Sequence, residues 1–213
     1  DTDALLHEAA SLPAELGQQV QLALAEAALW RVRGDVPAEC EACERALRLA
    51  HAADDALLLG RAFGALGRYH EVRDPARAFA CFQDSADHLR QAGVPDRTAS
   101  SDGVLLDEYS NTLVRLAWWY LLHNDPRAGP LLERAQALHD HSPRTLEVQA
   151  LLAQTWGEYW RRSGQLGPAL EHKYRALHLY QRLGDQQGML KAYCNLALIH
   201  GEAQDFARAI ECS

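Results

Sequence analysis

The chain has 213 residues, of which 48% are hydrophobic and 23% charged, and its formal net charge is −8. That hydrophobic content is enough for a packed core, so the composition excludes an intrinsically disordered chain. The negative charge argues against a nucleic-acid binder, which needs a basic face for phosphate contacts. No apolar run approaches the roughly 18 residues that a transmembrane helix needs, so we expect no membrane span.

The cysteine pattern favours a reducing compartment. Five cysteines are scattered along the chain, and an odd, unevenly spaced set is not a disulfide framework. We therefore expect free thiols and a cytoplasmic location. Lysine occurs only as Lys173 and Lys191 beside many arginines, a bias that favours a GC-rich, bacterial source.

A small residue followed three positions later by a ring recurs five times along the chain. The spacing is regular except for one longer step, and a fixed period of roughly 40 residues is typical of helical-repeat arrays. We therefore predict an all-α fold of antiparallel helix hairpins. The five pairs are Ala27 with Trp30, Gly67 with His70, Ala117 with Tyr120, Gly157 with Trp160, and Ala197 with His200.

Residues 1–213 are predicted to form a single array, and turn signals divide it into segments. The longer step is explained by residues 93–103, which are rich in turn formers and are predicted to be a loop insertion. Such an insertion often meets a partner, and a passive mobile loop is the alternative. The other segments are 1–12 (second helix of a preceding repeat), 14–53 (repeat 1), 55–92 (repeat 2), 104–141 (repeat 3), 144–183 (repeat 4) and 185–213 (incomplete repeat 5). Because both end segments lack part of a hairpin, we expect a fragment of a longer protein.

Helix-start signals recur between the two helices of each hairpin. Gly34 is suited to end a helix with a positive φ, and Asp35 can cap the next helix, with a proline in its first turn. Cap-and-proline signals recur at Asp74-Pro75 and Asp125-Pro126. The remaining two turns are predicted at Gly164-Gln165, with Pro168 inside the helix, and at Gln204-Asp205.

These residues resemble tetratricopeptide repeats (TPRs). Besides the small residue and ring of the first helix, the family's small residues on the second helix match Ala78, Gly129, Ala169, Ala209, Ala46 and Ala176. Glu39 stands where the family has a small residue and Glu26 where it has an apolar one. The resemblance implies a right-handed superhelical solenoid.

The long repeat unit is similar to the kinesin light chain type, on account of Tyr193-Cys-Asn-Leu-Ala and the Leu183-Gly184-Asp185 junction. That type is common in bacterial regulators, where the array sits beside a switch or effector domain. The resemblance therefore implies a place in a signalling or regulatory protein.

The resemblance also implies which first-helix residues face the concave groove and meet a partner. Six basic residues and three acidic ones (Glu71, Glu158 and Glu202) face it. Because arginine suits carboxylates and Trp118 gives an apolar middle, we predict a ligand with acidic and apolar residues. The alternative is that the arginines pair with those three glutamates. The predicted partner-binding residues are Arg31, Arg61, Arg68, Asn111, Val114, Trp118, Leu122, Gln154, Glu158, Arg161, Arg162 and Lys191.

No catalytic, cofactor or metal site is predicted. The sequence has no GxSxG, GxxxxGK[ST] or HExxH pattern. Cys40-Glu-Ala-Cys43 lacks the second pair that a zinc site needs, so buried structural cysteines are the favoured interpretation. His139-Asp-His141 could bind a metal, but histidines at helix ends commonly serve the helix dipole.

Three functions fit a repeat array, and an enzyme is the least expected. The first is a non-catalytic interaction scaffold that binds a protein or peptide in the groove. The second is a small-ligand sensor that controls an attached nucleotide-binding switch or effector domain. The third is a structural spacer or self-association element. We expect no nucleic-acid or membrane partner.

Overall fold

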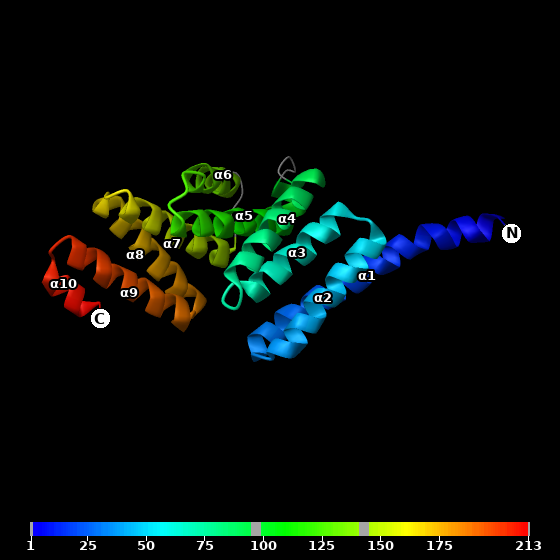
Figure 1. Ribbon diagram of the computed structural model, residues 1–213, viewed down its shortest axis with the longest axis horizontal. Helices are drawn as coiled ribbons and strands as arrows, with labels where there is room; N and C mark the ends of the chain where they lie inside the picture. The colour runs from blue at the N-terminus through cyan, green and yellow to red at the C-terminus, as the bar shows by residue number, and fades with distance from the viewer. Residues whose placement is uncertain (1, 95–98, 141–144, 213) are drawn as a thin grey trace. The chain divides into compact units, whose positions relative to one another are not determined.

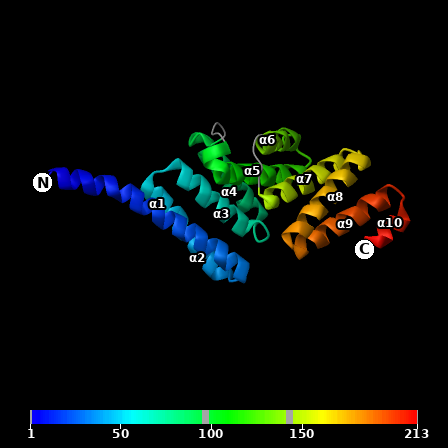
Figure 2. The same cartoon turned by 180° about the vertical axis from the view of Figure 1, so that it is seen from behind.

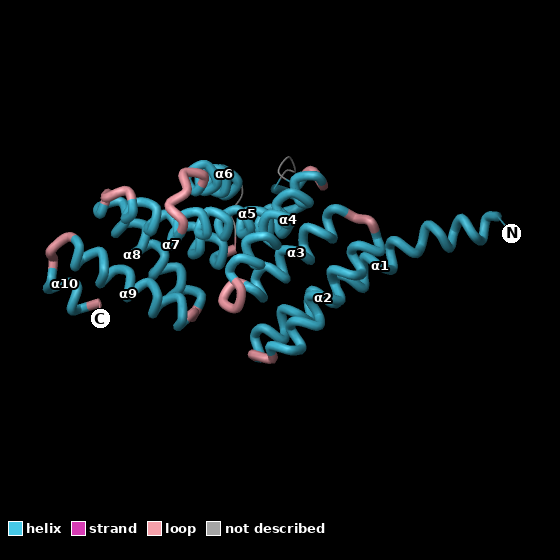
Figure 3. The backbone as a smooth tube through the Cα atoms, viewed as in Figure 1, coloured by secondary structure: helices cyan, strands magenta, loops and turns pink. Residues whose placement is uncertain are grey.

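The computed structural model describes the backbone of residues 2–94, 99–140 and 145–212, and the side chains of residues 15–94, 103–138 and 145–212. All secondary structure in these ranges is helical (Figure 3). Successive helices run antiparallel as hairpins, so the predicted all-α class is confirmed. None of the described helices combines the length and the apolar character needed to cross a membrane.

The chain divides into two compact units, Asp1–Arg97 and Thr98–Ser213, and the boundary falls within the predicted insertion. Figures 1 and 2 show the helices of each unit in chain order from opposite sides. Unit 1 contains α1 (Thr2–Arg33), α2 (Val36–Ala53), α3 (Ala56–His70) and α4 (Pro75–Gln91). Unit 2 contains α5 (Ala99–Leu122), α6 (Ala128–Asp140), α7 (Leu146–Arg162), α8 (Leu166–Leu183), α9 (Gln186–Glu202) and α10 (Phe206–Glu211).

Aspartate side chains cap several second helices, as the turn signals predicted. Asp35 accepts a hydrogen bond from the Ala38 backbone N–H at 3.1 Å, and Asp74 accepts one from Arg77 at the same distance. Such caps contribute about 1 kcal/mol each, because they satisfy an otherwise unpaired N–H of the first turn. Gly34 has the expected positive φ of 73°, which lets α1 end there.

The first helix departs from the prediction. Residues 1–12 were predicted to be a separate helix, but α1 runs without a break from Thr2 to Arg33 and so includes Pro13. A proline inside a helix removes one backbone hydrogen bond, yet α1 continues through Pro13.

Two boundaries in unit 2 also differ from the prediction. Helix α5 begins at Ala99, so at least residues 99–103 of the predicted loop are helical. Helix α6 begins at Ala128 instead of directly after Asp125. The Asp125 carboxylate accepts the Arg127 backbone N–H at 2.9 Å and pairs with its guanidinium at 2.6 Å. These local contacts engage the Asp125 side chain that was predicted to cap the helix. The side-chain hydrogen bond from Arg127 lowers the pKa of Asp125 to about 2.

The five small residues of the repeat lie in the first helix of successive hairpins: Ala27 in α1, Gly67 in α3, Ala117 in α5, Gly157 in α7 and Ala197 in α9. The first four are buried, and Ala197 is half-buried. Each small residue of the predicted repeat therefore lies on the first helix of a different hairpin.

Two of these positions are glycine because a large residue of the second helix fills the adjacent space. A Cβ added at Gly67 would lie 2.6 Å from Phe82 Cε1. A Cβ added at Gly157 would lie 2.8 Å from Cγ and Cδ of Lys173. Real Cβ atoms do not approach this closely, so the two hairpins require glycine at the contact.

Candidate functional site

First helices of successive hairpins meet through side chains one repeat apart. In unit 1, Arg61 Nη1 donates to Gln21 Oε1 at 2.5 Å, a separation of 40 residues. In unit 2, Arg161 Nη1 donates to Glu202 at 2.6 Å, and Arg162 Nη1 donates to the Leu121 carbonyl at 2.8 Å, each 41 residues apart. The predicted groove residues of neighbouring repeats therefore lie on a common face within each unit.

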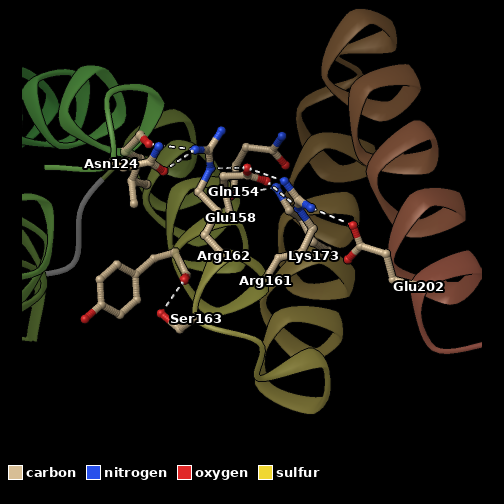
Figure 4. A network of polar contacts seen from close by, with 10 residues as sticks. Asn124, Gln154, Glu158, Arg161, Arg162, Ser163, Lys173 and Glu202 are labelled. Atoms are coloured by element: carbon tan, nitrogen blue, oxygen red, sulfur yellow. Dashed lines mark hydrogen bonds and ion pairs between the residues drawn. The ribbon is translucent and has the colours of Figure 1, made fainter. Parts of the chain in front are cut away.

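A connected set of polar side chains joins α5, α7 and α9 at their C-terminal ends (Figure 4). We call it the Glu158 network, and it consists of Asn124, Glu158, Arg161, Arg162 and Glu202. The Glu158 carboxylate accepts from Arg161 Nη2 at 2.8 Å, Arg161 Nε at 3.1 Å and Arg162 Nε at 2.7 Å. Arg162 Nη1 also donates to Asn124 Oδ1 at 3.2 Å.

The network is stabilised as ions. The Glu158 side chain is only 7% exposed. Burial raises the pKa of its carboxyl, but the hydrogen bonds from Arg161 and Arg162 outweigh burial, and the net pKa is lowered. The same contact raises the pKa of Arg161. Charge-assisted hydrogen bonds of this kind are stronger than neutral ones, so the network fixes the spacing of three helices.

A fully buried lysine lies beneath this network. Lys173, on α8, donates from Nζ to the Gln154 carbonyl at 2.8 Å, and its methylenes pack over Gly157. Burial lowers the pKa of the Lys173 ammonium to about 8, although the nearby Glu158 carboxylate opposes this shift. The lysine is thus a support of the face and is closed to solvent.

Two polar groups on this face of unit 2 lack a hydrogen-bond partner among the described residues. The side-chain oxygen of Gln154 is buried without a hydrogen-bond partner. Among the described residues, the Arg162 guanidinium uses Nε and Nη1, and its Nη2 has no acceptor. The Arg162 Nη2 donor is therefore free to bind an acceptor on another molecule, whereas the Gln154 oxygen is closed to solvent.

Apolar side chains are exposed beside these groups. Leu122 of α5 and Leu198 of α9 are each 48% exposed, and Trp118 is partly exposed. Trp118, Glu158 and Leu198 occupy the same position of successive repeats, as Leu122, Arg162 and Glu202 do. The face thus combines a charged centre with exposed apolar residues at equivalent positions on either side.

The predicted groove residues of unit 1 are engaged within that unit. Arg31 Nε pairs with Glu39 at 2.6 Å, and Arg73 approaches the same carboxylate at 4.0 Å. Arg61 is bonded to Gln21, and Arg68 is half-buried. Glu39 is buried, and the Arg31 contact neutralises it where the family has a small residue.

Some predicted contacts of unit 2 are corrected. Val114 is fully buried, because α5 packs against both α6 and α7, so it cannot meet a partner. Asn111 accepts a hydrogen bond from Arg115 at 2.6 Å, and Lys191 is exposed. In repeat 4 the alternative interpretation holds, since Arg161 and Arg162 pair with Glu158 and Arg161 also pairs with Glu202. The predicted excess of positive charge is therefore largely neutralised there.

The cysteine pair and the histidine segment, the two smaller candidate sites, have different outcomes. Cys43 is buried in α2, and burial raises the pKa of its thiol to about 11, as expected for a structural cysteine. Cys40 is only half-buried, so the prediction of two buried cysteines is wrong for it. The His139-Asp-His141 segment lies outside the residues whose side chains are described.

Sequence reasoning missed Lys173 and Asn124 as parts of this face or its support, whereas the repeat register placed Leu198 on the groove face. A signal for Lys173 was present, because it occupies the repeat position of Cys43, and this position is buried in both hairpins. Leu198 shares its repeat position with Trp118. Asn124 lies in a turn and has a positive φ of 53°, and no repeat pattern marks such a residue.

Comparison with known proteins gives a likeness of fold. No family model matches the chain, and no curated protein matches it. A crystal structure of BtubC (BKLC) from P. vanneervenii matches with a TM-score of 0.55 and 18% sequence identity. The match covers 99% of this chain and 82% of that chain. At this identity the likeness shows the fold alone, which is a TPR-like helical repeat.

Proposed function

We propose that the chain is a non-catalytic protein-interaction scaffold, and that the α5, α7 and α9 face of unit 2 binds a peptide or a segment of a partner domain. The observation that carries the proposal is the exposure of Leu122 and Leu198 beside the Glu158 network. The TPR-like fold supports the class of function, because repeat arrays bury their core between hairpins and leave one face for a partner.

The ligand is expected to carry both acidic and apolar residues. Arg162 Nη2 has no acceptor among the described residues and suits a carboxylate or a backbone carbonyl. Leu122 and Leu198 suit apolar side chains. The fixed network keeps these groups in place before binding, which reduces the conformational entropy lost on association.

The setting that we propose is a cytoplasmic, bacterial signalling or regulatory protein. The free cysteines support a reducing compartment. The resemblance to the kinesin light chain type of repeat supports the regulatory role, and the arginine-rich composition supports the bacterial source.

The proposal is tested by selecting ligands from a random pool, so that no partner has to be assumed. A phage-displayed library of random peptides is selected on the purified chain, and a synthetic copy of the most enriched peptide is titrated by isothermal calorimetry. We expect enriched peptides to combine Asp or Glu with apolar residues. The double variant Leu122→Ser, Leu198→Ser should weaken binding by about tenfold or more, as loss of an interface anchor does.

Val72→Ser is the matched control, because Val72 is 88% exposed and lies in unit 1. It should leave the affinity within about twofold, since surface substitutions away from a contact are nearly neutral. Peptides that bind the Leu122 and Leu198 double variant as tightly as the original chain would show that this face is not the binding surface.

A further inference from the structure

Unit 1 contains a buried histidine, His70, with an unsatisfied ring nitrogen. His70 is the last residue of α3 and is 7% exposed, and its Nε2 atom has no hydrogen-bond partner among the described residues. The neighbouring Tyr69 ring packs against it edge-on, with the ring centroids 4.8 Å apart. A neutral imidazole carries one N–H and one lone pair, so Nε2 is unsatisfied in either tautomer. Buried polar atoms are nearly always paired, so this exception needs a physical explanation.

The equivalent ring of unit 2 has a partner. His200 occupies the ring position of repeat 5, as His70 does in repeat 2, and it is 1% exposed. Its Nε2 lies 2.9 Å from the Tyr174 hydroxyl of α8, and its Nδ1 lies 3.8 Å from an Asp205 carboxylate oxygen. A phenol hydroxyl can donate to a neutral ring nitrogen or accept from a protonated one. His200 Nε2 therefore keeps a partner in both protonation states.

The repeat register explains the difference between the two rings. The register that aligns Cys43 with Lys173 also aligns Glu44 of α2 with Tyr174 of α8. Glu44 is exposed, and its carboxylate lies 3.9 Å from Arg48 Nη1 on the same helix. Unit 1 thus has an exposed carboxylate at the position where unit 2 has the phenol that binds the ring.

The surroundings of His70 disfavour its protonated form. Burial lowers the pKa of His70 below its ordinary value of 6.5. Arg77 of α4 and Arg73 of the turn lower this pKa further, whereas Asp74 of the turn and Glu44 of α2 raise it. The two positive and two negative neighbours oppose one another, so burial decides the direction. Protonation would also place an N–H donor at Nε2 without an acceptor.

His70 lies close to the contacts that hold α2, α3 and α4 together. Its backbone carbonyl accepts the Arg73 N–H at 2.9 Å, within the turn that leads into α4. One turn earlier on α3, Leu66 shares a buried cluster with Cys43 of α2 and Cys81 of α4. A charge placed on the His70 ring therefore acts on the α2/α3 contact and on the turn into α4 together.

We propose that His70 makes unit 1 sensitive to mild acid. Protonation of the buried ring loosens α3 against α2 and weakens the turn into α4, whereas the equivalent contact of α8 and α9 keeps its hydrogen bond through Tyr174. The response falls in the pH range where histidine is the side chain that ordinarily changes charge. It is built into unit 1 and does not use the face of unit 2 that is assigned to the proposed function.

Hydrogen–deuterium exchange of the full chain between about pH 7.5 and 5.5, followed by mass spectrometry, tests both units in one experiment. Because the pKa of His70 is lower in the folded than in the unfolded chain, the stability present above pH 6.5 is lost as the pH falls. After correction for intrinsic exchange, the protection of α3 peptides should fall by at least about threefold across this range. Peptides from α9 should keep their protection within about twofold.

Two substitutions exchange the ring's partner between the units. Glu44→Tyr places beside His70 the phenol that His200 has, and should reduce the acid-induced loss of α3 protection to within about twofold. Tyr174→Phe removes the partner of His200 Nε2 and should introduce a loss of at least about threefold in α9. Glu41→Tyr is the matched control, because it adds the same side chain to the α1 side of α2 and should leave the acid response of α3 unchanged.

His70→Phe assigns the effect to one residue, which is necessary because His51 and His88 also contact α3 through Phe63. This variant keeps an aromatic ring and should show constant α3 protection across the range. Constant protection in the unaltered chain would overturn the proposal, and so would an acid-induced loss that His70→Phe retains. If circular dichroism shows that His70→Phe does not fold, an unchanged acid response in Glu44→Tyr overturns the proposal instead. Glu44 is exposed, so that variant is expected to fold.

Discussion

The α1/α2 and α7/α8 hairpins fill the same internal space with different residues. In α1/α2 the first helix offers Ala27 and the second Cys43, whereas α7/α8 offers Gly157 and Lys173 at the same two positions. Both second-helix residues are fully buried. A longer side chain on one helix is thus matched by the loss of a methyl group on the other. The repeat preserves the combined volume at the contact, and the identity of each residue follows from its neighbour.

The same two hairpins also place their buried carboxylates differently. Glu39 lies in the first turn of the second helix of α1/α2, at the position that is Ala169 in α7/α8. Glu158 lies on the first helix of its hairpin and is bonded by two arginines. Glu39 stands where the other hairpin has a small, close-packed alanine, whereas Glu158 organises the proposed binding face. We therefore expect that removing each of these two carboxylates lowers the stability of the fold by a different amount.

The largest effect is expected from Glu158→Ala. Removing one member of a buried ionic set leaves two partly buried guanidinium groups without their anion, and such losses cost about 3 kcal/mol. Glu39→Ala should cost about 1 kcal/mol or less, because Arg31 and Arg73 are each about one-third exposed and can be solvated. Urea unfolding followed by tryptophan fluorescence and by circular dichroism measures both.

Tryptophan fluorescence reports chiefly on unit 2, because that unit holds four of the five tryptophans. Circular dichroism covers both units, so Glu39→Ala is judged by that signal. If the two variants lose equal stability, the Glu158 network does not support the face more strongly than the Arg31–Glu39 pair supports its hairpin.

A smaller effect is expected from Gly157→Ala. The added methyl would overlap the middle of the Lys173 side chain, which is buried and cannot swing away. Overpacking of this kind costs about 2 kcal/mol. Ala27→Gly is the reciprocal change in α1/α2 and should cost about 1 kcal/mol through helix propensity and lost packing.

The double variant Gly157→Ala, Lys173→Cys recreates the α1/α2 pair within α7/α8. It should be at least about 1 kcal/mol more stable than the sum of the two single effects, because the cavity left by one change accepts the methyl group of the other. Strict additivity would mean that the two positions are not coupled and that the volume argument fails. The free energies come from the same urea titrations.

The hairpin order and much of the face could be predicted from the sequence, because both depend on a period. The regular step identified the small positions of α1, α3, α5, α7 and α9, and placed Arg161, Arg162 and Glu202 on one face. Period alone does not tell which residues find partners. Arg162 reaches a carbonyl and Asn124 in the preceding turn, and that contact depends on the positive φ of Asn124.

Other features could not be predicted because they depend on packing between helices. Val114 is in register with the groove, yet α6 and α7 enclose α5 and bury it. Lys173 reads as a surface residue by type, and the only sequence signal for its burial over Gly157 is the repeat position that it shares with Cys43. Each of these outcomes is set by the surroundings of the residue and not by its type.

A small effect that tests the comparison by pH is expected from Lys173→Met. Methionine keeps a flexible stem over Gly157 and removes the ammonium, in a place where the other hairpin has an uncharged cysteine. Burial lowers the pKa of Lys173 from 10.5 to about 8. At pH 7 the lysine is charged in both the folded and the unfolded chain, and folding must desolvate that charge. The variant should therefore be about 1 kcal/mol more stable at pH 7, after the loss of the Gln154 hydrogen bond is included.

The sign of the pH dependence follows from the lowered pKa. Between about pH 8 and 10.5 the unfolded chain holds the Lys173 proton more tightly than the folded chain does. The stability of the original chain relative to the variant therefore rises through this window and stops rising above it. Lys173→Met should lack that rise, so the difference between the two urea midpoints should shrink as pH increases from 8 to 10.5. Taking the difference cancels other groups that titrate in both proteins. A constant difference across the window would mean that the folded chain solvates the Lys173 ammonium as well as water does, and the two hairpins would then differ in packed volume alone.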